Sequence, residues 1–402
     1  MFSMTSVAVI AAIALLVPLL LKLTRLPIPE VVVEIVLGII IGPQILGWAR
    51  VDEPVKVLSI IGLGFLLLLA GLEIDLSRLR GRLLRVTAAG YVVSFVLALI
   101  VGIAFGALGL VKSPLLVAVI LSATALGIVL PILKDAAQTE TPFGRLVVAG
   151  ASIAELVPIV LLSIFFSGQG SGIGMQLLLF FGFLVVVAGI FFAVNRLERS
   201  QMLARALLML QDTTAQIRVR GAFALLMLFT ALATNFGLEI ILGSFLAGIV
   251  LRLVDRDQDH THTSFRTKLQ GVGFGIFVPF FFVMTGMNLD VRSLFSNPST
   301  LIRVPIYLLA LLLVRGLPAL FYRPLAESRR QVLAAALLQA TSLSIPVVAG
   351  QIGVNLGLLT PGTYVALVAA GLISVVLFPL LAIPRLAPPD RDSPDPPSRS
   401  LG

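Results

Sequence analysis

The chain alternates long apolar runs with short polar segments over nearly its whole length. The runs reach about 20 residues, the length that an α-helix needs to cross the hydrocarbon core of a bilayer. A membrane β-barrel would instead show short segments of alternating polarity. The pattern therefore predicts an all-α polytopic membrane protein with about thirteen transmembrane helices. Their expected ranges are 4–21, 30–48, 56–72, 86–110, 114–133, 145–167, 174–195, 221–236, 238–254, 270–287, 301–322, 331–352 and 361–384.

Basic residues are concentrated in alternate loops of this pattern. Of the 29 Lys and Arg residues, 23 fall on one side, five fall on the other, and Arg315 remains inside a predicted span. By the positive-inside rule the basic side is cytoplasmic. We therefore expect a cytoplasmic C-terminus and an external N-terminus. The net charge of +9 reflects this topology, and no nucleic-acid partner is expected.

Composition excludes several classes of site. The chain is 58% hydrophobic and 12% charged, and it has no Cys, two His and one Trp. A disulfide framework and a thiol or His-rich metal centre are therefore excluded. No phosphate-cradling loop and no nucleophile–base set occurs, so we expect neither an enzyme nor a cofactor. Residues 1–385 are predicted to form one transmembrane domain, and the Pro-rich residues 386–402 a disordered cytoplasmic tail.

Three pairs of segments recur in the same order at nearly constant spacing. They are Gly71–Leu79 with Gly286–Leu294, Ala123–Leu130 with Ala340–Val347, and Gly150–Pro158 with Gly371–Pro379. The third predicted span runs inward and its partner, the tenth, runs outward. The two repeats therefore have opposite orientations, a hallmark of secondary transporters whose substrate site lies at the bilayer midplane.

Two predicted spans contain helix-breaking residues at matched positions of the repeats. The segment 122–131 holds small polar residues with Gly127 and Pro131, and the segment 341–346 ends in Pro346. Gly permits non-helical dihedrals and Pro removes a backbone donor. We predict a broken helix in each repeat, with freed backbone groups facing an ion. The alternative is a kinked helix whose Ser and Thr side chains bond their own backbone.

Glu155 and Arg315 are the two charges predicted to lie deepest in the membrane. A carboxylate at the bilayer centre costs about 2.5–3.5 kcal/mol and is by default a functional-site hypothesis. Each repeat supplies one charge that the other lacks, because the counterparts are Val376 and Leu97. Removal from water disfavours an ionised carboxyl, so Glu155 can hold a proton near neutral pH, and a bound cation would compete with that proton.

These residues define a predicted site for a monovalent cation and a proton. Glu155 is the expected shared carrier. Arg315 either offsets the negative half-helix ends or pairs with Glu155 when no cation is bound; the alternative is a purely structural ion pair. The candidate oxygen donors are the hydroxyl side chains of the two breaks: Ser122, Thr124, Thr341, Ser342 and Ser344.

Acidic residues near the span ends suggest more ordinary roles. Glu73 and Asp75 end the third predicted span before an Arg-rich loop, where we expect surface salt bridges. Glu239 lies in a short outer turn, where an exposed loop carboxylate is expected ahead of a cation-attracting group.

Four segments resemble a known family. Pro29–Gly47, Phe65–Asp75, Gly243–Leu251 and Phe280–Asp290 are similar to the Kef-like branch of the monovalent cation:proton antiporters, within the sodium/proton exchanger superfamily. The resemblance covers about residues 5–385. It implies a homodimer in the bacterial inner membrane. It also implies a mobile core, about 86–167 and 301–384, in which two crossed broken helices move like an elevator against a scaffold.

The resemblance places the family's ion-binding carboxylate on Glu155 and its conserved basic residue on Arg315. The family usually has Asp at the first position, preceded by Asp, Asn or Gln, where this chain has Ala154. A doubled acid is associated with exchange of two protons, so its absence favours electroneutral exchange of one Na⁺ or K⁺ for one H⁺. The rival hypotheses are a sodium-coupled carrier of organic anions, anchored by Arg315, and a passive cation channel.

Overall fold

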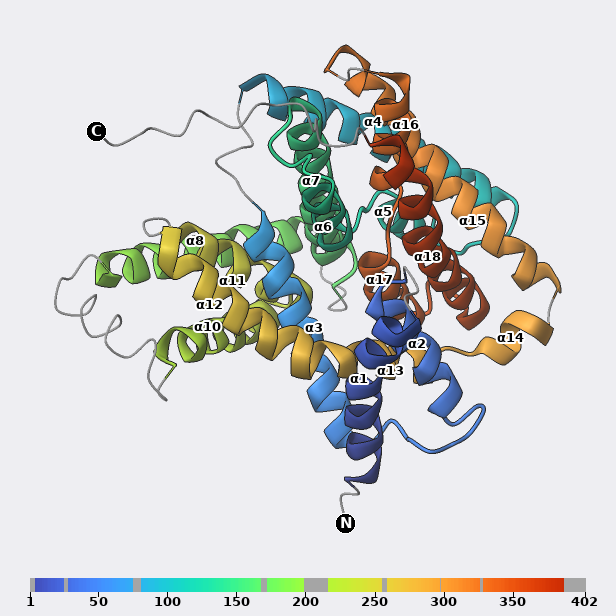
Figure 1. The fold of residues 1–402 in the computed structure, drawn as a ribbon, viewed down its shortest axis with the longest axis horizontal. Coiled ribbons are helices and arrows are strands. Elements are labelled where there is room, and N and C mark those ends of the chain that lie inside the picture. The colour runs from blue at the N-terminus through green and yellow to red at the C-terminus, as the bar shows by residue number, and fades with distance from the viewer. Residues whose placement is uncertain are drawn as a thin grey trace, which may run out of the picture.

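The computed structural model describes residues 4–24, 28–74, 81–167, 172–198, 216–254, 259–296, 298–325 and 328–386. Every regular element within these ranges is a helix, which confirms the predicted all-α class (Figure 1). Within these ranges eleven helical segments, some of which join two or more consecutive helices, are long and apolar enough to cross a membrane. The predicted tail, 386–402, lies outside the described residues except for Leu386.

The helices follow the apolar runs of the sequence closely. In chain order they are α1 (Thr5–Thr24), α2 (Glu30–Ile41), α3 (Glu53–Glu73), α4 (Gly81–Ala107), α5 (Pro114–Leu121), α6 (Leu126–Asp135), α7 (Pro142–Phe165), α8 (Ile173–Glu198), α10 (Ile217–Asn235), α11 (Ile240–Val254), α12 (Asp259–Val272), the π-helix η1 (Gly273–Phe277), α13 (Val278–Asn288), α14 (Val291–Ser296), α15 (Pro298–Gly316), the 3₁₀-helix η2 (Leu317–Leu325), α16 (Arg329–Gln339), α17 (Ser344–Asn355), α18 (Pro361–Ala382) and the 3₁₀-helix η3 (Ile383–Arg385).

Two predicted spans are shorter than a full crossing. The expected span 30–48 forms only the 12-residue α2, and the expected span 238–254 forms the 15-residue α11. At 1.5 Å per residue these helices are roughly 18 and 23 Å long, against a hydrocarbon core of about 30 Å. The count of thirteen therefore stays a prediction.

One group of helices packs through close backbone contacts. α3 packs on α11 and α2 packs on α13. The contact between α3 and α11 requires glycine, because a Cβ added to Gly71 would lie 2.2 Å from the Phe245 carbonyl oxygen, and one added to Gly248 would lie 2.1 Å from that of Leu68. Small residues at a crossing let two membrane helices approach closely. Replacing either glycine would force α3 and α11 apart.

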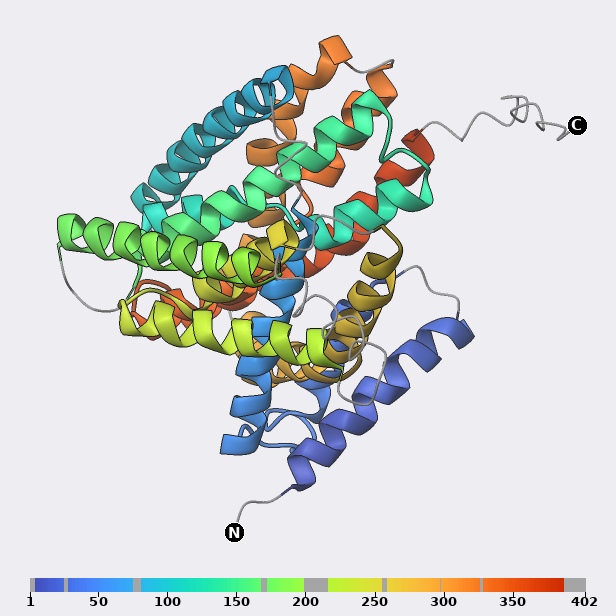
Figure 2. The same ribbon diagram turned by 90° about the vertical axis from the view of Figure 1, so that its left-hand side faces the viewer.

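A second group combines α4–α7 with α15–α18. α4 packs on α5 and α7, α15 packs on α18, and α17 contacts both α5 and α18. Figures 1 and 2 show this group beside the helices α8 and α10–α12. The two groups meet where α3 contacts α6 and where α11 contacts α7. The second group includes the ranges predicted for a mobile core, and its movement as one body stays a prediction.

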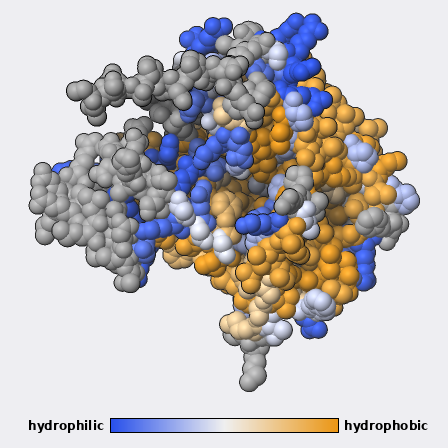
Figure 3. Space-filling model, viewed as in Figure 1, coloured by the Kyte–Doolittle hydropathy of each residue, from blue (hydrophilic) through white to orange (hydrophobic). Residues whose placement is uncertain are grey.

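The surface agrees with a membrane environment. Large apolar side chains are exposed along α1, α4 and α8, including Leu15, Ile103 and Phe192. In Figure 3 hydrophobic residues cover most of the right-hand side of the molecule, over α15 and α18, and hydrophilic residues gather at its upper edge. Such an apolar surface is suited to contact with lipid chains.

Candidate ion-binding site

The chain contains two interrupted helices that face each other. α5 ends at Leu121 and α6 begins at Leu126, and Ser122–Ala125 between them is not helical. α16 ends at Gln339 and α17 begins at Ser344, leaving 340–343 as the second break. The two breaks begin 218 residues apart, which matches the spacing of the sequence repeats.

The breaks lie earlier in each segment than the predicted residues. Gly127 is the second residue of α6, Pro346 is the third residue of α17, and Pro131 lies inside α6. The prediction that these three residues mark the breaks is therefore wrong. Backbone N–H groups in the first turn of a helix have no intrahelical partner, so a proline there removes no hydrogen bond. Pro131 removes only one bond within the second half-helix.

Backbone groups freed at the breaks bond across the site. The Ala125 N–H donates to the Thr341 carbonyl at 2.9 Å, and the Thr124 N–H donates to the Ala154 carbonyl at 3.2 Å. The Thr124 hydroxyl donates to the Gln339 carbonyl at 2.5 Å. Each break therefore satisfies polar groups of the other or of α7, as buried backbone requires. The alternative of a merely kinked helix is excluded for both segments.

Arg315 is buried at the junction of the two breaks. Its side chain is 3% exposed. Nε donates to Thr124 Oγ1 at 2.8 Å, Nη1 to Ser94 Oγ at 3.1 Å and Nη2 to Gln339 Oε1 at 2.5 Å. The guanidinium also lies 5.8 Å from the centre of the Tyr91 ring. The planar fork thus joins the first break, α4 and the end of α16.

Glu155, on α7, is held by the N-terminus of α6. Its side chain is 4% exposed, and Oε2 accepts a hydrogen bond of 3.0 Å from the N–H of Leu126, the first residue of α6. The N-terminus of a half-helix favours negative charge. Arg315 donates to oxygens of neutral side chains, so the Glu155–Arg315 ion pair considered from the sequence is not formed among the contacts of these described residues.

A small cavity of about 80 Å³ opens beside the Glu155 carboxylate. It lies between the two helix groups and contains two carboxylates, Glu155 and Glu73, and one hydroxyl, Ser344. Its lining comprises Val31, Leu66, Leu67, Leu69, Ala70, Glu73, Ala125, Gly127, Ile128, Glu155, Phe274, Phe282, Leu343 and Ser344. The cavity thus combines acidic oxygens with residues of both breaks, in an otherwise apolar wall.

Of the five predicted hydroxyl donors, Ser344 lines this cavity. The hydroxyls of Ser122 and Thr341 donate to carbonyls of their own helices, at 2.9 and 3.2 Å. Thr124 is bonded to Arg315 and Gln339. Ser342 Oγ is buried, with no hydrogen-bond partner among the described residues. A hydroxyl that donates a hydrogen bond keeps lone pairs for a cation, so all five hydroxyls stay predicted oxygen donors, and Ser344 is the one that lines the cavity.

Glu73 is a site residue that the sequence interpretation missed. Its side chain is 12% exposed, Oε1 lies 3.6 Å from Arg266 Nη2, and Oε2 is buried without a hydrogen-bond partner among the described residues. The expected salt bridge exists, but it lies at the cavity and not on the open surface. Its position at a span end gave no signal of burial. Asp75 falls outside the described residues.

Ser374 is a second residue without a sequence signal. Its hydroxyl accepts from the Ser342 N–H at 3.2 Å and lies 3.1 Å from the Ser342 carbonyl, so one α18 side chain positions the second break.

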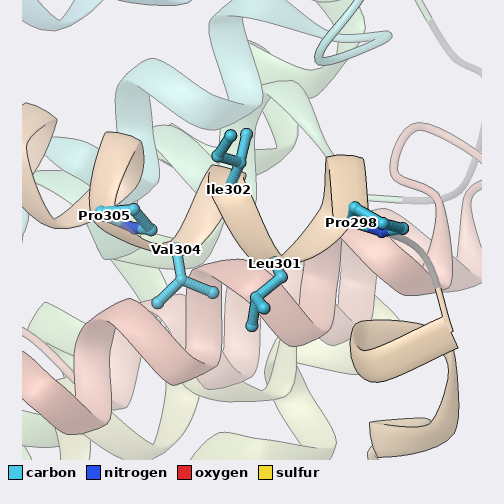
Figure 4. A pocket seen from close by; sticks show the side chains of 5 residues that line it. All are labelled: Pro298, Leu301, Ile302, Val304 and Pro305. Carbon is cyan, nitrogen blue, oxygen red and sulfur yellow. The ribbon is translucent and has the colours of Figure 1, made fainter.

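A separate hollow of about 480 Å³ on α15 is lined by Pro298, Leu301, Ile302, Val304 and Pro305 (Figure 4). These five side chains are apolar and offer no ligand for an ion.

Comparison with known proteins identifies relatives of this chain. The family model for the sodium/hydrogen exchanger, transmembrane, matches residues 11–384. The chain is 31% identical over 393 residues to a putative Na⁺/H⁺ antiporter, YjbQ, of Bacillus subtilis, covering 94% of this chain and 62% of that protein. It is 29% identical to the probable Na⁺/H⁺ antiporter 3 of Methanocaldococcus jannaschii, covering 93% and 94% of the two chains.

A solved structure has the same fold. The sodium proton antiporter MjNhaP1 from Methanocaldococcus jannaschii at pH 8 superimposes with a TM-score of 0.67, covering 95% of this chain and 96% of that chain at 18% identity.

Proposed function

The chain belongs to the transmembrane sodium/hydrogen exchanger family, and we propose that it is a secondary antiporter exchanging a monovalent cation, Na⁺ or K⁺, for H⁺. Glu155 is the shared carrier of cation and proton, and the expected physiological role is pH homeostasis. The proposal rests above all on one observation: a buried carboxylate lines a small cavity between the two helix groups, next to two interrupted helices.

The chemistry follows from the oxygens around the cavity. Na⁺ and K⁺ are hard cations that prefer oxygen ligands. Glu155, Glu73 and Ser344 reach the cavity from three separate helices. Two carboxylates in so small a space repel each other when both are ionised. A proton or a cation relieves that repulsion, and either one excludes the other, which is the competition that exchange requires.

Arg315 serves this site indirectly. Its charge lies beside the breaks, but its donors contact Thr124, Ser94 and Gln339, and it is not among the residues lining the cavity. It offsets the carbonyl ends of the interrupted helices and fixes their crossing. An organic anion would need a cation that faces the cavity, so this arrangement does not favour a carrier of organic anions.

One-for-one exchange is supported by the partner of the second carboxylate. Glu73 is paired with Arg266, and Ala154 stands beside Glu155. Of the two carboxylates that line the cavity, Glu155 is therefore the one without a basic partner among the described residues. Exchange of one cation for one proton is then electroneutral.

The cavity lies between two helix groups, and an elevator-like shift of α4–α7 with α15–α18 would carry Glu155 across the membrane. A homodimer, with the C-terminus in the cytoplasm, would hold the other group in place.

Proton movement in proteoliposomes tests this function. The protein is reconstituted with a pH-sensitive dye, and Na⁺, K⁺, Li⁺ or Rb⁺ is added in turn. Cation-dependent proton flux in the wild type, whose rate does not change with an imposed membrane potential, would support electroneutral exchange and identify the ion. Cation flux without proton movement would favour a channel, and uptake of a labelled organic acid would favour the other rival.

A further inference from the structure

The cavity carboxylate Glu73 is in contact with a cation that belongs to the protein itself. Arg266, on α12, places Nη2 3.6 Å from Glu73 Oε1. Its side chain is 35% exposed, whereas that of Glu73 is 12% exposed. Arg266 therefore lies on the solvent side of the pair, between the cavity and the surface of the protein.

The two oxygens of Glu73 have different surroundings. Oε1 faces Arg266, whereas Oε2 is buried without a hydrogen-bond partner in the described part of the chain. A Cβ added to Gly127 would lie 3.8 Å from Oε2. Gly127 follows Leu126, whose N–H binds the Glu155 carboxylate. The unpartnered oxygen of Glu73 is thus placed beside the first turn of α6, which also binds the Glu155 carboxylate. A positive ligand at this place would satisfy both carboxylates.

We propose that Arg266 is a tethered cation that competes with the transported cation for Glu73. This inference rests on the exchange function proposed above. While Arg266 is paired with Glu73, its guanidinium neutralises part of the negative charge of the cavity. The incoming cation gains the full charge of Glu73 only when the guanidinium moves away. Arg266 thereby sets the apparent affinity for the cation and helps the ion to leave.

The geometry of the pair suits such a reversible role. The separation of 3.6 Å is that of an ion pair, longer than a charge-assisted hydrogen bond, and the Arg266 side chain is partly exposed, so the two groups separate easily. α12 continues directly into the π-helical turn η1, whose Phe274 lines the cavity. π-helical turns are frequent at functional sites. A shift of α12 would move the competing cation and part of the cavity wall together.

The test is the cation concentration at half-maximal exchange in proteoliposomes. Arg266→Gln removes the competitor and should lower that concentration roughly two- to fivefold, the range of a partly exposed ion pair. Arg266→Lys keeps the positive charge and should stay nearer the wild type. Lys268→Gln removes the same charge from the same helix and controls for a general change of surface potential. Arg266→Met, which keeps an apolar stem, replaces the Gln variant if that protein does not accumulate.

A double-variant comparison separates competition from other effects. In a Glu73→Gln background the Arg266→Gln substitution should no longer change the apparent affinity, because its target has gone. Cation-dependent thermal stabilisation of the purified protein gives a second readout, and its onset should move to lower cation concentration in Arg266→Gln. Unchanged affinity in both readouts, or an equal shift in Lys268→Gln, overturns the inference. Wild-type protein without any cation-driven proton flux overturns the proposed function instead.

Discussion

Arg315 and Thr124, 191 residues apart in the chain, are joined by a hydrogen bond of 2.8 Å from Nε to Oγ1. The same hydroxyl donates to the carbonyl of Gln339, whose side chain accepts a second bond from the guanidinium. A single buried cation therefore connects the first break to the end of α16. We therefore expect the Arg315 side chain to hold the two broken helices at their crossing.

Replacing Arg315 should destabilise the protein. Arg315→Ala leaves the buried side-chain oxygen of Gln339 without its donor and removes one donor each from the Thr124 and Ser94 hydroxyls. We expect a loss of about 3 kcal/mol or more in the free energy of unfolding. Arg315→Lys keeps the charge but not the three-way fork, so an intermediate loss is expected. Thermal unfolding in detergent measures both, with the exposed Arg85→Ala as control. Wild-type stability of Arg315→Ala would refute its role in the crossing.

The contact between α3 and α11 should not tolerate a methyl group. Gly248→Ala places a Cβ 2.1 Å from the Leu68 carbonyl oxygen, and backbone must shift to relieve the overlap. We expect little folded protein in the membrane. Gly189→Ala on α8 is the matched control, because a Cβ there meets nothing within 4 Å. Size-exclusion chromatography of the detergent-solubilised variants decides, and equal monodispersity of the two would contradict the packing.

Ser374 should affect both stability and ion binding. Ser374→Ala removes the hydroxyl that bonds the backbone of Ser342, at an expected loss of about 1–3 kcal/mol. Because the second break then loses a positioning contact, the apparent cation affinity should also fall. Thermal unfolding and the exchange assay test the two effects. Ser152→Ala, which removes a hydroxyl bonded within its own helix at Val148, should lower affinity much less; equal effects would argue against a special role for Ser374.

Glu239 gives a prediction about pH. It lies in the turn before α11, where it is half-buried, and this burial raises the pKa of its carboxyl above its ordinary value of 4.5. The folded protein therefore favours the protonated form, and stability is lost as pH rises from about 4.5 through the folded pKa. Glu239→Gln should raise the melting temperature at pH 8 and change it little at pH 4. A larger effect at pH 4 than at pH 8 would reverse the sign and contradict the burial argument.

The parts of the site that could be predicted from sequence are those where residue type alone is unusual. Glu155 and Arg315 stand in long apolar runs, and a charge there is improbable without a function. The interrupted helices could be predicted because small polar residues recur at matched positions in both repeats. The exact positions of the breaks could not be predicted, because proline in a first helical turn removes no hydrogen bond. Pro346 therefore lies in the first turn of α17 and does not break it.

Other parts of the site depend on packing between distant segments. Glu73 stands at a span end before an Arg-rich loop, where a surface role is the ordinary expectation. The packing of α3 against α6 brings it to the cavity that Glu155 also lines. Ser374 is an ordinary serine in an apolar helix until α18 packs beside the second break. The apolar run ending near Trp48 also reads as one span, although the helix within it ends at Ile41.

The central claim is that Glu155 carries the cation and the proton, and Glu155→Gln tests it most directly. The glutamine is nearly isosteric and its oxygen can still accept from the Leu126 N–H, so the fold should be retained, while the ionisable group is lost. Cation-driven proton flux in proteoliposomes is compared with the wild type and with Glu53→Gln, an exposed acid on α3. The account predicts normal flux in the control and none in Glu155→Gln. Retained cation-driven proton flux in folded Glu155→Gln would contradict it.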